Sequence, residues 1–551
     1  MDIWLMVSMK LKKTTKKDSI MDLSRKLPIG IQSFQQMREE GFVYVDKTDL
    51  MWNMVQRYRA VFLGRPRRFG KTLLTTTMQC YFEGKKELFT GLAVEKLETE
   101  WRKRPVLRFD MSYIKGDIPS EMRTSIALLL KKYELKYGLT EVGTTLPGKR
   151  LMALIDTICH QTNEKVVVLI DEYDSPMLAA KHEDKEEVRN ILREFYTPLK
   201  ACFENLHFVY LTGITKFSQM SIFSELNHLM NISMMSDFSG ITGFTKDELC
   251  KYFCEEIRDF AQKESLSIEE LKLELRKHYD GYHFAKNLQG IYNPYSLLKS
   301  LETKEFDNYW FESGTPTFLI DEMKRLNTNI TEFDYIEVPS SAFNVPVESV
   351  EDAIPLLYQS GYLTIKDYNR EDDRYVLSIP NQEVRIGLTE ELITNYTGLS
   401  HRQTEGKAYD LWKSMKGNNP QQFIQELRAY VKGIPYVEGF KKKLAEVDNK
   451  EGFYEWTFYL IFSMLNSRIR TQVKTIDGRI DALAEFNDAV WVIELKLNGT
   501  PQEALEQINS KDYAIPYTAG NRTIYKIGLS FSTNPDNGYL VEGEYEIEGN
   551  N

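Results

Sequence analysis

One stretch near the start of the chain joins an apolar run to a basic loop that contains glycine. The run AVFLG at residues 60–64 is followed directly by RPRRFGKT at 65–72, and then by a segment of helical character. The free N–H groups at the start of a helix bind phosphate, so a loop ending in Gly70 before such a helix suits a nucleotide. Lys71 would reach the β and γ phosphates of ATP, and the Thr72 hydroxyl would bind Mg²⁺. The spacing therefore predicts a strand, a phosphate-binding loop and a helix.

The loop differs from the usual phosphate-binding pattern in its first half. The pattern begins with a glycine at the position where this chain has Arg65. Pro66, Arg67 and Arg68 also make the loop stiffer and more basic than usual. We expect Arg65, Arg67 and Arg68 to contact the phosphates of the bound nucleotide. Contacts with nucleic acid, or with the nucleotide of a neighbouring subunit, are the alternatives.

A second apolar run supplies the acidic groups that a nucleotide site needs. The run KVVVLID at residues 165–171 ends in Asp171, which is followed by Glu172. Asp171 can hold Mg²⁺ through water, and Glu172 can orient the water that attacks the γ-phosphate. The alternative is that these acids simply begin a solvated loop. Because chance rarely places both runs in this order, we expect nucleotide binding, with hydrolysis or slow switching both open.

A third apolar run, HFVYLTG at residues 207–213, also ends in polar residues. ATPases of this kind place a sensor of the γ-phosphate at the end of such a strand. Thr212, Thr215 and Lys216 are the candidates for this role. Each of them can also be a structural cap or a surface group.

The order of apolar and helical segments predicts an α/β multidomain protein. The runs at 60–64, 105–112, 165–171 and 207–213 are apolar enough for strands covered on both faces, as in a parallel sheet wrapped by helices. The segment 350–386 predicts a helix and two short strands, a winged-helix-like unit. The expected parts are a basic, disordered tail at 1–24, a P-loop ATPase domain at 25–244, a helical lid region at 245–345, a winged-helix-like and helical region at 346–440, and a C-terminal α/β domain at 441–551.

The C-terminal segment IDGRIDALAEFNDAVWVIELKLNG predicts a hairpin with a chemical site. A tight turn at Asn487-Asp488 would place Asp481 opposite Glu494, with Lys496 on the same face. Two facing carboxylates repel each other unless a cation lies between them, so the pair predicts a divalent metal, Mg²⁺ or Mn²⁺. Lys496 would then orient the attacking water or hold the phosphate. A surface hairpin with ordinary salt bridges is the alternative.

A helix is expected directly after this hairpin. Thr500 is a suitable N-cap, Pro501 fits the first helical position, and Glu503 completes a capping box. Gln507 would lie on the face of this helix that returns to the carboxylates.

Composition limits the cell compartment and the partners. The net charge of −10 argues against a protein covered in basic surface for nucleic acid, although a local basic channel stays possible. The five cysteines are scattered and odd in number, which favours free thiols in a reducing cytoplasm. No apolar stretch is long enough for a membrane helix, so we expect no membrane association.

The C-terminal motif resembles the PD-(D/E)xK nuclease superfamily. The matching residues are Asp477-Gly478-Arg479-Ile480-Asp481, Glu494-Leu495-Lys496 and Gln507. The resemblance implies a restriction-endonuclease-like α/β domain, with Asp481 and Glu494 as metal ligands. It also implies an acidic residue on the preceding helix, and Glu455 is the candidate.

The rest of the chain is similar to the AAA-ATPase-like proteins of gut anaerobes that are fused to such a nuclease domain. The matching segments are LPIGIQSF, YVDKT, RPRRFGKT, IDEYD, TGITKFS, SIFSELN, YDGYHF, YNPYSLL, YWFESGTP, LLYQSGYL and IPNQEVR. Lys216 departs from the arginine expected in the sensor region. The resemblance implies an ATP- and Mg²⁺-binding ATPase coupled to a nuclease that acts on nucleic acid, DNA above RNA, with a role in defence or DNA processing.

Two other interpretations remain open at this stage. The protein can be a nucleotide-switched regulator that binds nucleic acid or protein without cleavage, or a plain ATPase with a structural C-terminal cap. An oligomer and an unknown protein trigger are both possible. His278 and His283, which flank the sequence YDGY, are expected to pack among aromatic residues and to have no catalytic role.

Overall fold

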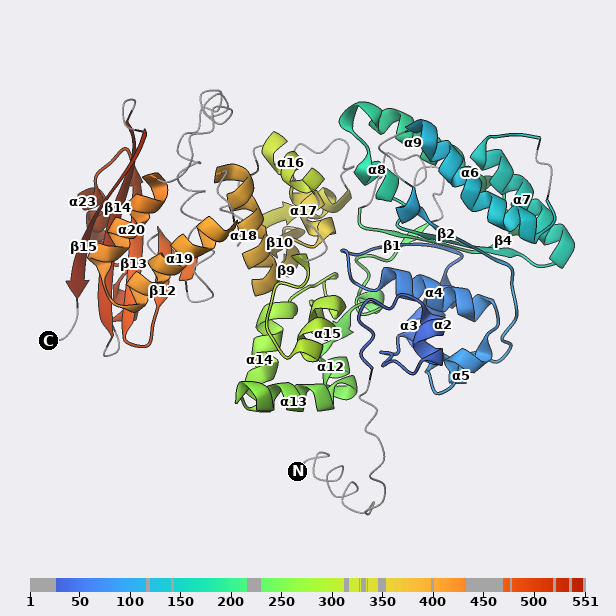
Figure 1. Ribbon diagram of the computed structural model, residues 1–551, viewed down its shortest axis with the longest axis horizontal. Helices are drawn as coiled ribbons and strands as arrows, with labels where there is room; N and C mark the ends of the chain where they lie inside the picture. Colours follow the sequence, from blue (N-terminus) through green and yellow to red (C-terminus); the bar gives the residue numbers. More distant parts are fainter. Residues whose placement is uncertain are drawn as a thin grey trace, which may run out of the picture.

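The computed structural model describes most of the chain in three parts that follow one another in space (Figure 1). The described residues are 26–114, 119–139, 143–215, 229–311, 317–326, 328, 333, 335–344, 353–397, 401–432, 469–475, 478–518, 522–534 and 538–548. The predicted tail at 1–24, Lys216 and Glu455 lie outside these residues. No helix in the described part of the chain is long and apolar enough to cross a membrane.

A parallel sheet forms the centre of the N-terminal part. Its strand order is β2-β3-β4-β1-β5, and every neighbouring pair is parallel. The strands are β1 (Ala60–Gly64), β2 (Val106–Asp110), β3 (Val166–Asp171), β4 (Leu206–Gly213) and β5 (Met230–Asn231). The four predicted strands are therefore confirmed, whereas β5, with two residues, is too short to leave a pattern in the sequence.

Helices cover both faces of this sheet, which is why its strands are apolar throughout (Figure 1). Val166, Val168 and Ile170 of β3 enter one core, whereas Val167 and Leu169 enter the core on the opposite face. The first core is covered by α6 (Pro119–Lys136), α7 (Pro147–Thr162) and α9 (Lys185–Tyr196). The second is covered by α2 (Phe34–Glu39), α3 (Thr48–Arg57), α4 (Lys71–Phe82) and α5 (Val94–Leu97).

The middle part has a helical unit and a small β-containing unit. The helical unit contains α12 (Lys246–Tyr252), α13 (Cys254–Glu264), α14 (Ile268–Tyr279) and α15 (Pro294–Thr303). The second unit contains α16 (Thr317–Arg325), β8 (Ile336–Pro339), α17 (Ile354–Ser360), β9 (Thr364–Asn369), β10 (Arg374–Ser378) and α18 (Gln382–Thr397). The helix and two strands that were predicted are present, and β8 adds a third strand in the order β8-β10-β9.

The YDGY sequence forms the joint between these two units. Tyr279 and Tyr282 are buried, and Gly281 has a φ of +93°. A side chain at Gly281 would collide with the carbonyl oxygen of Pro380, so only glycine allows the two segments to approach this closely. The Nδ1 atom of His283 lies 2.7 Å from the carbonyl oxygen of Ile365. The expected packing role of this segment is confirmed.

The C-terminal part is a mixed sheet covered by helices on both faces. Its strand order is β11-β12-β13-β14-β15, in which only the β13–β14 pair is parallel. The strands are β11 (Ile469–Thr475), β12 (Gly478–Glu485), β13 (Ala489–Leu497), β14 (Thr523–Asn534) and β15 (Gly538–Glu548). One core is shared with α19 (His401–Lys416) and α20 (Pro420–Lys432), and the other with α23 (Pro501–Ser510).

Candidate nucleotide and metal sites

The predicted phosphate-binding loop leads from β1 into the first residue of α4. Gly70 is the N-cap of α4 and has left-handed backbone angles (φ 80°, ψ 19°), which glycine adopts without strain. The Lys71 ammonium donates hydrogen bonds to the carbonyl oxygens of Arg65 and Pro66, both at 2.9 Å. Burial lowers the pKa of Lys71, and the nearby carboxylates of Glu172 and Asp171 oppose this shift. The loop is thus folded around the lysine that we expect to reach phosphate.

Arg65, which replaces the first glycine of the pattern, is buried in the structure. Its guanidinium donates to the carbonyl oxygens of Gly64 (2.9 Å), Ser233 (2.7 Å) and Phe238 (3.2 Å). It also lies 4.1 Å from the centre of the Phe284 ring. Burial lowers its pKa to about 10. Arg65, expected at the phosphates, is therefore engaged within the fold, where it joins the loop to the segment at 233–238 and to Phe284.

Arg67 and Arg68 are both exposed and both line the cavity next to the loop. Arg68 has a positive φ of 67°, and its guanidinium lies 4.5 Å from the centre of the Tyr295 ring. The two side chains can therefore reach a ligand in the cavity. Their predicted contact with phosphate remains a prediction.

The two predicted acids lie at the end of β3, beside the start of α4. Asp171 is buried, and burial raises its pKa to about 6, while the Thr72 hydroxyl and the Lys71 ammonium oppose the shift. Its Oδ2 atom is buried without a hydrogen-bond partner among the described residues. An unpaired carboxylate oxygen beside a hydroxyl fits a hard divalent cation such as Mg²⁺. Glu172 has a positive φ of 48°, and burial raises its pKa as well.

Asp110 is a third acid at this sheet edge that the sequence analysis did not select. It is the last residue of β2 and is the register partner of Asp171 in β3. Its negative charge raises the pKa of both Asp171 and Glu172. Its Oδ1 atom accepts hydrogen bonds from the N–H (3.1 Å) and the hydroxyl (2.6 Å) of Ser112. Asp110 could have been found from the sequence, because it lies at the end of an apolar run that was predicted to be a strand of the parallel sheet.

The candidate sensor residues at the end of β4 are engaged in the fold. The Thr212 hydroxyl donates to the carbonyl oxygen of Leu63 at 2.7 Å. The Thr215 hydroxyl donates to Asp174 at 2.8 Å, and both residues are buried. Neither threonine needs a ligand to satisfy its hydroxyl group. A sensor role for Thr215 stays a prediction.

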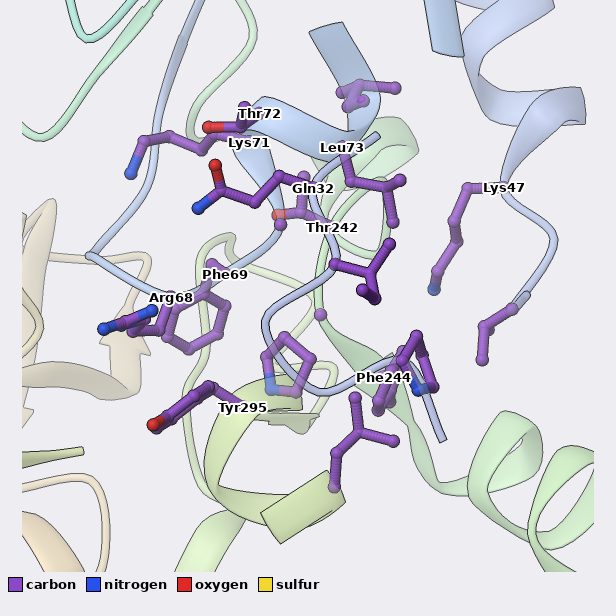
Figure 2. Close-up of a pocket in the computed structure, with 18 of the residues that line it drawn as sticks. Gln32, Lys47, Arg68, Phe69, Lys71, Thr72, Leu73, Thr242, Phe244 and Tyr295 are labelled. Atoms are coloured by element: carbon purple, nitrogen blue, oxygen red, sulfur yellow. The ribbon is translucent and has the colours of Figure 1, made fainter. Parts of the chain in front are cut away.

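A cavity of about 430 Å³ opens beside the phosphate-binding loop (Figure 2). Its polar lining includes Lys47, Lys71, Thr72 and Glu172. Its apolar lining includes Ile31, Met37, Val43, Tyr44, Ile241, Phe244, Pro294 and Leu298. A volume in this range, lined mostly by apolar groups with a few polar ones, is typical of small-molecule and cofactor sites. The walls come from the N-terminal segment, from α4 and from the helical unit.

The C-terminal hairpin has the predicted register. The turn at Asn487-Asp488 is closed by a hydrogen bond from the Phe486 N–H to the Ala489 carbonyl oxygen at 2.8 Å, and Ala482 pairs with Ile493. One residue further from the turn on each strand, the side chains of Asp481 and Glu494 face each other. The Asp481 Oδ2 atom accepts the Leu495 N–H at 2.8 Å, and a Glu494 oxygen lies 3.5 Å from the Asp481 amide nitrogen.

Four predicted side chains of this domain meet on one face of the hairpin. Gln507 of α23 donates to Glu494 and accepts from the Lys496 ammonium. The predicted start of α23 is also confirmed, since Thr500 and Glu503 form a capping box. Burial, reinforced by the charge of Asp481, raises the pKa of Glu494 to about 8.

This donor set fits a divalent cation, because a cation between the carboxylates would relieve their repulsion. Within the described ranges, no group of three or more His, Cys, Asp or Glu side chains is placed to hold a metal. The two carboxylates at this hairpin would therefore need water or phosphate oxygens to complete the coordination of a metal ion.

Comparison with known proteins identifies the class to which these two sites belong. Residues 28–223 match the model of a predicted AAA-ATPase family, and residues 449–538 match the PD-(D/E)XK nuclease superfamily. The chain belongs to the family of AAA-ATPase-like proteins that carry a C-terminal PD-(D/E)XK nuclease-superfamily domain.

One relative matches along almost the full length. It is described as an uncharacterized protein in the vnfD 5' region of Azotobacter chroococcum mcd 1, and it is 34% identical over 535 residues, covering 94% of this chain and 99% of that protein. Among solved structures, a Walker-type ATPase of Pyrococcus abyssi is similar, at 14% identity and a TM-score of 0.34. That match covers 66% of this chain and 97% of the other.

Proposed function

We propose that this protein binds and hydrolyses ATP with Mg²⁺ at the loop before α4, and that this site controls a metal-dependent nuclease centred on Asp481 and Glu494. The observation that carries the proposal is the meeting of Asp481, Glu494, Lys496 and Gln507 on one face of the C-terminal hairpin. Nucleic acid is the proposed substrate, with DNA ahead of RNA.

At the first site, the residues divide into phosphate-binding and water-orienting groups. The N–H groups at the start of α4 and the Lys71 ammonium would bind the β and γ phosphates. Thr72 and Asp171 would hold Mg²⁺, which neutralises charge on the phosphates when it is bound. Glu172 would orient the attacking water. The unpaired Oδ2 atom of Asp171 supports this assignment, because a metal or its bound water would satisfy it.

At the second site, Asp481 and Glu494 would hold Mg²⁺ or Mn²⁺, which supplies Lewis-acid activation of water and of the scissile phosphate when it is bound. Lys496 would bind the phosphate oxygen or position the water. Gln507 fixes the orientation of both Glu494 and Lys496. Glu455 is retained as a proposed additional acid.

The second candidate is a nucleotide-switched regulator that binds nucleic acid or protein without cleavage. The net charge of −10 favours it, because an acidic protein attracts a nucleic-acid substrate less strongly. The complete set of four side chains favours the enzyme. Action in the cytoplasm, a role in defence or DNA processing, an oligomeric state and a protein trigger are further parts of the proposal.

The decisive experiment uses the full chain with plasmid DNA, single-stranded DNA and RNA in Mg²⁺ or Mn²⁺, with and without ATP. Glu494→Ala is expected to abolish cleavage and to leave ATP binding unchanged, because the two sites are built from separate sheets. Cleavage that persists in Glu494→Ala would overturn the nuclease assignment. Nucleic-acid binding that depends on ATP, with no cleavage in any condition, would establish the regulator instead.

A further inference from the structure

The phosphate-binding loop is in close contact with a turn of the middle part. Gly361 ends α17 with a φ of +91°. A Cβ atom placed on Gly361 would lie 2.7 Å from the Pro66 Cβ and 2.8 Å from its Cγ. Real carbon atoms do not approach this closely, so any larger residue at 361 must displace the proline or the turn. The two segments meet although they lie far apart in the sequence.

Two further residues of the loop belong to the same contact region. Phe69 is fully buried and packs edge-on against Tyr282 at 4.8 Å and Phe284 at 5.3 Å between ring centres. This core also contains residues of α17. The ring of Phe284, which Phe69 contacts, also lies against the Arg65 guanidinium. The loop is therefore packed into the core of the middle part by side chains at both of its ends.

These contacts act on the residue that would bind phosphate. The Lys71 ammonium is held by the carbonyl oxygens of Arg65 and Pro66. Arg65 is fixed by the carbonyls of Ser233 and Phe238, and the Pro66 ring packs against the backbone of Gly361, with no room for a Cβ atom between them. A shift of the turn at Gly361 would therefore move the carbonyl group of Pro66 and, with it, the lysine.

We propose that Arg65 and the contact between Pro66 and Gly361 are positioning elements of the nucleotide site, through which the middle part sets the affinity for ATP. The inference rests on the proposed function, because it takes ATP as the ligand of the loop. By thermodynamic linkage, nucleotide binding must in turn stabilise the contact at Gly361. The turn at Gly361 would therefore become more stable when nucleotide binds, although Gly361 does not line the cavity.

The test compares two glycine variants in the full chain. Gly361→Ala is expected to weaken ATP binding about tenfold, measured by calorimetry in Mg²⁺. Gly138→Ala is the control. Gly138 also has a positive φ, of 69°, but a Cβ atom placed on it would meet nothing within 4 Å, so the change introduces the same kind of backbone strain away from the loop. Its ATP affinity is expected to equal that of the wild type. Equal affinities of Gly361→Ala and the wild type, with both folded, would overturn the inference.

Two further measurements complete the test. Arg65→Lys keeps the charge but loses the planar fork that reaches several carbonyls, so it is expected to weaken ATP binding even if Gly361→Ala fails to fold. Hydrogen exchange across α17 is expected to slow when ATP binds the wild type and to stay unchanged in Gly361→Ala. Unchanged exchange in the wild type despite bound ATP would contradict the linkage. A wild type that binds no nucleotide would instead refute the proposed ATP site.

Discussion

Asp174 holds Thr215 in place through one carboxylate oxygen, which accepts hydrogen bonds from the Thr215 N–H at 2.7 Å and from its hydroxyl at 2.8 Å. The Ile214 N–H donates to the same oxygen at 2.9 Å. Asp174 follows β3, whereas Thr215 follows β4. The hydrogen bonds therefore join the ends of two neighbouring strands at the sheet edge where Asp171 lies.

Replacement of Asp174 is expected to destabilise this edge. Asp174→Ala leaves the Thr215 N–H and hydroxyl, which are buried, and the partly buried Ile214 N–H without an acceptor, which should cost about 3 kcal/mol in the free energy of unfolding. Urea unfolding of the purified chain measures the loss. The control is Glu183→Ala, since Glu183 is exposed and its removal should change little. An equal effect of the two substitutions would contradict the role of Asp174.

Glu172 is expected to act in hydrolysis and to contribute little to ATP binding. Glu172→Gln keeps the size of the side chain but removes a base that can orient and accept a proton from water. The rate of ATP hydrolysis should fall about 100-fold, with the dissociation constant for ATP unchanged. A phosphate-release assay and calorimetry measure the two quantities. A hydrolysis rate equal to that of the wild type would exclude Glu172 from this role.

Gln507 is expected to support cleavage by holding Glu494 and Lys496. Gln507→Leu removes both hydrogen bonds and should lower the cleavage rate or the metal affinity about 10- to 100-fold. Gln502→Leu is the matched control, because Gln502 is exposed on the same helix. Cleavage of a labelled DNA substrate over a range of Mn²⁺ concentrations measures both effects. If the two variants cleave alike, Gln507 has no part in the site.

Glu383 should make the stability of the fold depend on pH between about 4.5 and 8. One of its oxygens accepts the Trp310 N–H at 2.8 Å, and burial raises its pKa to about 8. Because the folded pKa lies above the unfolded value of about 4.5, the folded protein keeps a proton that the unfolded chain releases. The stability that this proton provides is full below about pH 4.5, falls as the pH rises, and is lost once the pH has passed about 8.

The stability of Glu383→Gln should therefore be less sensitive to this pH rise, since a glutamine does not ionise. Thermal unfolding midpoints of both proteins, followed from about pH 5 to pH 9.5, measure the difference. The wild-type midpoint should fall relative to that of the variant between about pH 5 and pH 8, and the two curves should run parallel above pH 8. Parallel curves over the whole range would show that the pKa of Glu383 is not raised in the folded protein.

Local patterns in the sequence were enough to predict single strands and the C-terminal hairpin. The strand that ends in Asp171 was visible because both of its faces are buried, which leaves an unbroken apolar run. The turn at Asn487-Asp488 fixed the hairpin register, and with it the approach of Asp481 to Glu494. In each case, residues close together in the sequence decide the geometry.

The remaining features depend on contacts between distant segments. Nothing near Arg65 in the sequence shows that its guanidinium is buried against Ser233 and Phe284. Asp110 becomes part of the nucleotide site only because β2 lies next to β3 in the sheet. Similarly, the Thr215 hydroxyl looked available for a ligand until Asp174 was placed beside it. Such relationships follow from the strand order, which no local pattern encodes.

The cavity beside the phosphate-binding loop limits how short a fragment of this protein can be while keeping the cavity closed. Part of its wall comes from Pro294, Tyr295 and Leu298, beyond residue 223, where the match to the ATPase family ends. An ion pair of 2.5 Å between Lys47 and Glu248 ties the N-terminal segment to the same helical unit. A fragment cut at the family boundary would open the cavity to solvent. The smallest portion that recombination or cloning could transplant with this cavity intact therefore extends at least to Leu298 of α15.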